Sequence, residues 1–333
     1  MLPNGRRLGA HLPLGRGLVR AADRAAVIGA SALQVFSDNP TSWRRRGRLP
    51  EELPAFLARL AHHGIAPLTI HAPYLVNLAS PDALVRDRSV DLLANELRVA
   101  AAYRATIVNV HAGSHRGDGP DAGTDRLADG FRRVFDLVGE DGAGVALVLE
   151  NGAGGGFGLG STIEELVAID RALTRAGVPA DRTGFCLDTA HLWGAGYRID
   201  TAAGVDDVIV SFDGLLGIGR LRLMHLNDSR SEAGSRADRH EHLGAGRIGP
   251  DGLGRVLTHP ALHRVPYILE TPGMEDGWDE VNVRRAYDLA AGRPLPDLPA
   301  EAFATRSARG RSAPPDTDVD PDPEGASATP MTT

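Results

Sequence analysis

Short aliphatic runs alternate with longer amphipathic segments eight times along this chain of 333 residues. Near-continuous apolar character is expected of parallel strands that are covered on both faces. The runs occupy residues 7–14, 32–37, 67–71, 106–111, 145–150, 184–188, 221–226 and 266–270. The segments with helical periodicity between them occupy residues 18–28, 51–63, 82–103, 124–138, 162–176, 205–216, 250–257 and 279–290, and Ser161 with Glu164 matches a capping box at the start of the fifth. Eight strand–helix repeats predict an α/β protein with a single (β/α)8 TIM barrel, which we assign to residues 1–293.

The composition changes after about residue 293. Residues 294–333 are rich in Pro, Ala, Asp, Ser and Thr and lack apolar periodicity, so we predict a disordered C-terminal tail. The tail is acidic, because residues 314–333 hold five carboxylates and no basic side chain. The net charge of the whole chain is −7, so removing these five charges leaves −2 on the rest. The acidic balance therefore does not exclude a nucleic-acid partner for the barrel.

No uninterrupted apolar run approaches the ~18 residues that a membrane span requires. The N-terminal segment has no apolar stretch of the kind found in secretory signals. Cys186 is the single cysteine, which excludes an internal disulfide and suits a reducing compartment. We expect a soluble, monomeric, cytoplasmic protein with no membrane partner.

Residue types that bind metals stand at the carboxyl ends of six of the eight runs. In an α/β barrel these ends form the face on which active sites lie. A lone histidine at a strand end is more often structural than a ligand, but six such residues in the same relative position are difficult to attribute to chance. The six are His71, His111, Glu150, Asp188, His225 and Glu270.

Three more candidate ligands lie just beyond those ends. His191 follows Asp188 by three residues, and Asp238 and His240 belong to a loop dense in histidines and carboxylates at residues 225–242. A solvated polar loop is the simpler interpretation of that stretch taken alone. Together the nine residues are too many for one tetrahedral ion and suit three divalent ions. Such a cluster favours phosphoryl chemistry, in which two ions share a hydroxide and another steadies the departing oxygen.

The motifs that carry these residues resemble those of the endonuclease IV family of abasic-site nucleases. The resemblance covers residues 9–290, and its most specific part is the D-R-H-E-H-x-G-x-G-x-I-G pattern that begins at Asp238. The matching segments are GAHLPLGRGL (9–18), LQVFSDNPTSW (33–43), HAPYLVNLAS (71–80), NVHAGSH (109–115), LVLENGAGGG (147–156), CLDTAHLWGAGYRID (186–200), HLNDSRSEAGSRADRHEHLGAGRIG (225–249) and LETPG (269–273).

The resemblance implies three zinc ions per chain and cleavage of duplex DNA on the 5′ side of abasic sites, as in base excision repair. The products would be a 3′-hydroxyl and a 5′-deoxyribose phosphate. It assigns His71 and His111 to one ion, Asp188, His225 and Glu270 to a second, and His191, Asp238 and His240 to the third. Glu150 would bridge the first two, and Glu150 and Glu270 would be the catalytic carboxylates.

The same resemblance suggests contacts with DNA. Tyr74 matches a position that the family inserts into the duplex, although an aromatic ring packed over the barrel end is an equal alternative. Asn39 and Arg44 are further candidates for DNA contacts. The chain departs from the family where Asp38 and Thr41 stand in a usually basic segment, and Arg44, Arg45 and Arg46 would replace the missing phosphate contact. His11, His115 and His242 are expected to support the ligands or to contact phosphate.

A second departure follows the bridging glutamate, where Asn151 and Gly152 replace a usual pair of threonines. The glycines at 154–156 do not form G-x-G-x-x-G, so we expect them to shape a loop and predict no nucleotide cofactor.

Two alternatives remain open. A sugar isomerase or epimerase of the xylose-isomerase-like barrels would need a single-ion set such as Glu150, Asp188, His225 and Glu270, but it leaves the other five candidates unexplained. A non-catalytic lesion-binding protein is the other.

Overall fold

The computed structural model describes residue 2 and residues 5–309 of the chain. Within this part, eight parallel strands close into a barrel in the order β1-β10-β7-β6-β5-β4-β3-β2. The strands are β1 (Leu8–His11), β2 (Ala32–Val35), β3 (Leu68–His71), β4 (Ile107–His111), β5 (Ala146–Glu150), β6 (Thr183–Asp188), β7 (Leu221–His225) and β10 (Tyr267–Leu269). Each strand lies within or next to a predicted aliphatic run, so the barrel prediction is confirmed.

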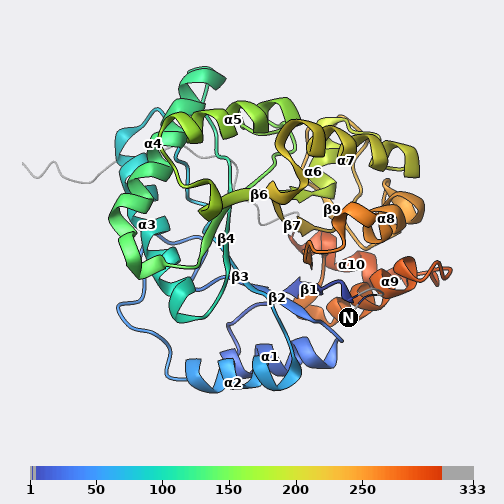
Figure 1. Cartoon of the computed structure of the whole chain (residues 1–333). Coiled ribbons are helices and arrows are strands. Elements are labelled where there is room, and N and C mark those ends of the chain that lie inside the picture. The colour runs from blue at the N-terminus through green and yellow to red at the C-terminus, as the bar shows by residue number, and fades with distance from the viewer. Residues whose placement is uncertain (1, 3–4, 310–333) are drawn as a thin grey trace, which may run out of the picture. The chain divides into compact units, whose positions relative to one another are not determined.

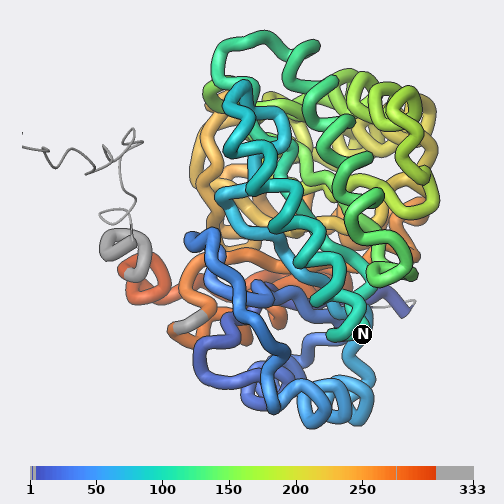
Figure 2. Tube along the Cα trace, turned by 90° about the vertical axis from the view of Figure 1, so that its left-hand side faces the viewer, coloured from blue at the N-terminus to red at the C-terminus, as the bar shows by residue number. Residues whose placement is uncertain are grey.

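Helices surround the strands as a ring, which Figure 1 shows from one end and Figure 2 from the side. Each predicted helical segment is present, with ends that shift by a few residues. The helices are α1 (Leu18–Val27), α2 (Leu53–His63), α3 (Ala83–Ala102), α4 (Pro120–Val138), α5 (Ile163–Arg175), α7 (Ala202–Leu216), α8 (Gly249–Thr258) and α9 (Trp278–Ala290). The predicted cap of α5 is one residue early, because the Thr162 side chain accepts from the Glu165 N–H while the Glu165 carboxylate accepts from Ser161.

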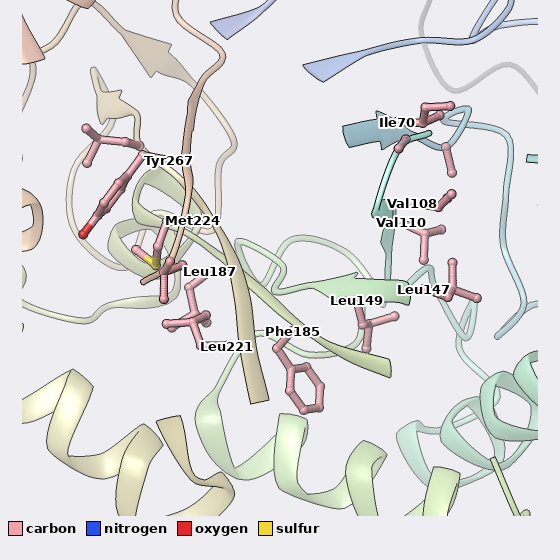
Figure 3. Packing of buried hydrophobic residues seen from close by; sticks show 14 of the residues in the cluster. Ile70, Val108, Val110, Leu147, Leu149, Phe185, Leu187, Leu221, Met224 and Tyr267 are labelled. Atoms are coloured by element: carbon pink, nitrogen blue, oxygen red, sulfur yellow. The ribbon is translucent and has the colours of Figure 1, made fainter. Parts of the chain in front are cut away.

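The apolar core has two parts, which follow from the two-residue period of a strand. Outward side chains such as Leu149 and Phe185 pack between the strands and the helices (Figure 3). A smaller inward cluster fills the inside of the barrel, and its buried members are Ala32, Ile107, Val148, Cys186, Leu223 and Ile268. This inward layer matters for function, because the residue two positions later on each of these strands, or just past its end, is polar and points to the same face.

Two short elements near the ends of β6 and β7 were not predicted. Helix α6 (Thr189–Ala195) begins directly after β6 and carries His191. A short antiparallel hairpin pairs β8 (Asp228–Ser229) with β9 (His240–Glu241) and projects from the end of β7. Both are too short to show a periodic pattern, and both carry residues of the candidate site.

The chain divides by its contacts into two units, of which the first ends at Leu298 and the second begins at Pro299. The second unit contains α10 (Ala300–Arg309), a helix inside the segment predicted as an unstructured tail. Alanine, glutamate and arginine in this segment favour a helix, a preference that the missing apolar periodicity concealed. The acidic stretch at residues 314–333 lies outside the described residues. No helix in the described part is long and apolar enough to cross a membrane.

Candidate metal centre

Strand register gathers the predicted ligands at the carboxyl end of the barrel. His111 lies opposite Glu150 in the pairing of β4 with β5, and Asp188 lies opposite His225 in the pairing of β6 with β7. Glu150, Asp188 and His225 each follow a member of the inward apolar layer by two residues, as Glu270 follows Ile268. The alternation of side chains along a strand therefore places these four side chains directly above the inward apolar cluster, at the carboxyl end of the barrel.

The first donor group joins β3, β4 and β5. His71, His111 and Glu150 each offer one ligand atom, and these atoms lie within 4.8 Å of one another. The Nε2 atoms of both histidines are 3.5 Å from Oε2 of Glu150. Glu150 and His71 are buried, whereas the His111 side chain is 43% exposed and leaves one side of the group open.

The second donor group consists of Glu150, Asp188, His225 and Glu270. Nδ1 of His225 lies 3.1 Å from Oε1 of Glu150 and 3.3 Å from Oε2 of Glu270. Glu150 therefore belongs to both the first and the second group, with one carboxylate oxygen facing each. That is the arrangement expected of a carboxylate that bridges two ions.

The third donor group is Asp188, His191 and His240. Asp238 lies beside it, since its carboxylate is 3.3 Å from Nε2 of His191 and 3.0 Å from Nε2 of His240. Asp188 is shared between the second and third groups, because its Oδ2 is 3.6 Å from Nε2 of His240. The structure thus brings eight of the nine predicted ligands into three adjacent groups and places the ninth, Asp238, beside the third.

Three buried amides orient these carboxylates, and sequence reasoning assigned them no role. Asn109 donates to Oε2 of Glu150 across 2.6 Å, and Asn227 donates to Oδ2 of Asp188 across 2.6 Å. Gln34 donates to Oε1 of Glu270 across 2.7 Å. Each lies on an inward position two residues from a strand-end ligand or from the inward apolar layer. This spacing is the signal that could have identified them.

Three of the histidines hold Nδ1 against a backbone carbonyl, which leaves Nε2 as the atom that can bind a cation. His71, His191 and His240 place Nδ1 at 2.7, 2.8 and 2.9 Å from the backbone carbonyls of Ala72, Asn151 and Glu270. Nδ1 must carry a proton to donate there, so Nε2 is the atom that faces the carboxylates and that can bind a cation once it has released its own proton. Nε2 of His240 is buried and faces the carboxylates of Asp188 and Asp238. An imidazole lone pair held among carboxylates fits a zinc-type divalent cation.

The charges of the group are strongly coupled. Burial alone would raise the pKa of Glu150, but the imidazoles of His225 and His111 outweigh it and hold that pKa well below its usual value. Burial opposes protonation of His240, yet Asp188 and Asp238 raise its pKa to about 10. Protons therefore neutralise the carboxylates wherever no cation does so.

The three supporting histidines have different surroundings. His11 is buried beside the site, with Nδ1 3.0 Å from Oε1 of Glu270. His115 instead accepts the Gly119 N–H through Nδ1 at the start of α4, outside the three groups. His242 is buried against α9, where it accepts from Asn282 and packs on Trp278. His11 thus contacts a predicted ligand directly.

The candidate DNA contacts lie on loops at the same end. Tyr74 is 60% exposed, and its ring centroid is 5.3 Å from that of Phe36 and 6.0 Å from that of His111. It both packs over the first group and presents a free face. Asn39 is exposed, but its Oδ1 accepts two hydrogen bonds from Thr41. Arg44 is exposed.

The glycine-rich loop after β5 passes close to the hairpin that carries Asp238. A Cβ atom on Gly155 would lie 2.7 Å from the backbone oxygen of Arg236, so only glycine fits this approach. The glycines thus shape a loop, as expected, and this loop also packs against the hairpin, which the sequence did not indicate.

The closed barrel places the chain in a class of TIM-barrel proteins. The family described as xylose isomerase-like TIM barrel matches residues 22–289 of the chain. A D-tagatose 3-epimerase-like protein of known structure has a TM-score of 0.60 with 16% identity, covering 86% of this chain and 99% of that one, and this likeness shows the fold alone.

Two other relatives identify the family more narrowly. A probable endonuclease 4 of Methanoculleus marisnigri is 40% identical over 283 residues, which cover 85% of this chain and 98% of that protein. The crystal structure of endonuclease IV from Thermus thermophilus is 37% identical with a TM-score of 0.71, covering 84% of this chain and 98% of that one. The chain belongs to the endonuclease IV family of hydrolases, and the resemblance noted in its motifs is confirmed.

Proposed function

We propose that the protein is a zinc-dependent endonuclease that cleaves duplex DNA on the 5′ side of abasic sites in base excision repair. Water adds across the P–O3′ bond, so that the products are a 3′-hydroxyl and a 5′-deoxyribose phosphate. The observation that carries the proposal is the set of three adjacent donor groups joined by two shared carboxylates, Glu150 and Asp188. The proposal takes the enzyme to be a cytoplasmic monomer.

The proposed ligands follow the three groups. One zinc would be held by His71, His111 and Glu150, a second by Glu150, Asp188, His225 and Glu270, and a third by His191, Asp238 and His240. When bound, divalent cations at such a centre supply Lewis-acid stabilisation of the charge that develops on phosphate oxygens.

The side chains of the protein supply orientation. Asn109, Asn227 and Gln34 hold the carboxylates through their amide groups, so the donor atoms cannot rotate away. The buried floor of Val148, Cys186 and Ile268 excludes water from below. The partly exposed His111 and Asp238 leave the upper side open to a substrate.

The DNA would approach that open side. Tyr74 presents an exposed ring beside His111, at a place where an abasic gap would accept an aromatic side chain. Arg44 offers a guanidinium for the DNA backbone.

A cleavage assay tests the proposal. Zinc-loaded protein is incubated with an end-labelled duplex that contains one stable abasic analogue, with the undamaged duplex and chelator-treated protein as controls. We expect a single cut on the 5′ side of the analogue, and a 3′ end that a DNA polymerase can extend. Intact duplex after incubation with protein shown to hold about three metals per chain would refute the proposed activity.

A sugar epimerase is the second candidate, and one observation favours it. Glu150, Asp188, His225 and Glu270 form a four-donor group that is sufficient for one ion. That function leaves His71, His111, His191, Asp238 and His240 without a purpose. Metal analysis separates the two, because about one ion per chain supports the epimerase and about three support the nuclease.

A further inference from the structure

The loop between β2 and α2, residues 36–52, contains the three consecutive arginines that the sequence offered as phosphate contacts. Their guanidinium groups have different environments. Arg44 is exposed and makes no ion pair with any residue that the structure describes. Arg46 lies 3.4 Å from Oδ1 of Asp38. Arg45 turns inward, and its side chain is only 11% exposed.

Arg45 ties the loop to itself and to the barrel. Its Nη2 donates to the backbone carbonyls of Asn39 and Ser42, which lie on opposite sides of the turn that precedes it. Its Nη1 lies 3.7 Å from Oε1 of Glu96, a fully buried residue of α3. A guanidinium used in this way is directed away from any DNA on the outer surface of the loop.

Glu96 connects the loop to the end of β2. Its Oε2 accepts a hydrogen bond of 2.6 Å from Oγ of Ser37. Its Oε1 has no hydrogen-bond partner in the described structure, and neither does Nη1 of Arg45. A buried carboxylate with one hydrogen bond is costly unless a cation lies close, so the Arg45 charge is the group that favours it here.

The connection extends to the candidate metal centre. Ser37 directly follows Phe36, whose ring centroid lies 4.4 Å from that of His11 and 5.3 Å from that of His71. The same ring is 5.3 Å from that of Tyr74. Holding Ser37 therefore holds the residue on which a proposed ligand and a proposed DNA contact both pack.

We propose that Glu96 and Arg45 are positioning residues, which form a buried clasp that holds the β2–α2 loop so that Arg44 faces the DNA backbone. Arg45 is then a part of the scaffold and not a phosphate contact. The inference rests on the proposed function, because it assigns the loop to DNA binding.

A matched pair of variants tests the division of roles. Affinity for abasic duplex is measured against salt concentration for Arg44→Gln and Arg45→Gln, because each lost phosphate contact reduces the slope of log K on log salt by about one. Arg44→Gln should reduce the slope. Arg45→Gln should weaken affinity about tenfold at every salt concentration with the wild-type slope. A reduced slope for Arg45→Gln would overturn the proposal.

Hydrogen exchange provides a readout that does not depend on DNA or activity. Glu96→Gln keeps the acceptor for Ser37 but loses the charge. Above pH 7, where Glu96 is ionised, both it and Arg45→Gln should therefore speed amide exchange in residues 38–48 of the free protein. Arg48→Gln, which removes an exposed arginine of the same loop, is the matched control and should leave exchange unchanged. Unchanged exchange in Glu96→Gln and Arg45→Gln would refute the clasp even if the enzyme cleaves DNA.

The kinetic constants complete the test. Both clasp variants should raise KM about tenfold while kcat at saturating DNA stays within about threefold of wild type. A failure of the wild-type protein to cleave would refute the proposed function, and faster loop exchange in the variants would then still support the clasp itself.

Discussion

The side-chain amide of Asn109 donates a 2.6 Å hydrogen bond to Oε2 of Glu150, the carboxylate oxygen that also faces His71 and His111. Both residues are buried, and they lie on adjacent strands of the barrel. One lone pair of the oxygen is thereby occupied and the other is directed to the first donor group. This bond fixes the orientation of the Glu150 carboxylate without the need for a bound ion.

Replacing Asn109 should therefore weaken metal binding without unfolding the protein. Asn109→Ala frees the carboxylate to rotate, and loss of such an outer partner typically costs about 10- to 100-fold in metal affinity. Competition with a chromophoric chelator measures this affinity, and the circular dichroism spectrum checks the fold. Wild-type zinc affinity in a folded Asn109→Ala variant would contradict the role given to this bond.

Glu150→Gln should lower turnover by orders of magnitude while the fold remains intact. The amide keeps the size of the side chain but removes the charge that joins the first and second donor groups. Cleavage of abasic duplex at saturating DNA is the measurement, with metal content determined on the same sample. Full activity in this variant would remove Glu150 from the bridging position.

Zinc binding should release protons near neutral pH. Asp188 and Asp238 raise the pKa of His240 to about 10 against the effect of burial, so the metal-free protein keeps this imidazole protonated at neutral pH. A cation requires the neutral ring, and metal affinity should consequently rise with pH up to that value. Calorimetric titrations of zinc in buffers of different ionisation enthalpy count the protons. Binding with no proton release at neutral pH would show that the ring is already neutral.

Tyr74→Ala should reduce affinity for abasic duplex and leave the metal content at the wild-type value. The ring is 60% exposed and packs on Phe36 rather than serving as a ligand. Stacking of an aromatic side chain on bases is worth about 1–3 kcal/mol, or about 5- to 150-fold in Kd. Fluorescence anisotropy with abasic and undamaged duplexes gives the comparison. An equal loss of affinity for both duplexes would argue against insertion at the lesion.

The free energy of unfolding of Glu96→Gln, compared with that of the wild type, should rise with pH, even though the variant loses the local ion pair with Arg45. Burial raises the pKa of Glu96 from 4.5 to about 7, although Ser37 and Arg45 oppose the shift. The folded state thus retains a proton that the unfolded state has lost, and the contribution of Glu96 to stability falls as pH rises from about 4.5 to 7. The glutamine side chain cannot ionise, so the difference in free energy of unfolding between the variant and the wild type should grow in favour of the variant over this window, by about 3 kcal/mol.

Denaturant unfolding of both proteins on the acidic and the basic side of this window measures the difference. An advantage that is the same at both pH values would show that Glu96 does not ionise in this range.

The sequence by itself determined the barrel and most of its metal-binding face. Eight aliphatic runs separated by amphipathic segments admit few other folds, and in a parallel barrel the carboxyl ends of the strands must meet at one face. A ligand type at the end of a run therefore implies proximity to the others, which is why His71, Glu150 and His225 could be placed together from their positions alone.

The family resemblance implied how those ligands are grouped, but only the tertiary structure decided which donor atoms lie close together and what supports them. The approach of Asp238 to His191 depends on a hairpin and a short helix that carry no periodic signal. Asn109 and Gln34 resemble ordinary strand residues until the barrel closes and turns them inward. Arg44 and Arg45 are equivalent in sequence, but the buried carboxylate of Glu96, distant along the chain, draws one inward and leaves the other exposed. A charge that must be buried needs a partner in space, and spacing along the chain does not reveal which partner that is.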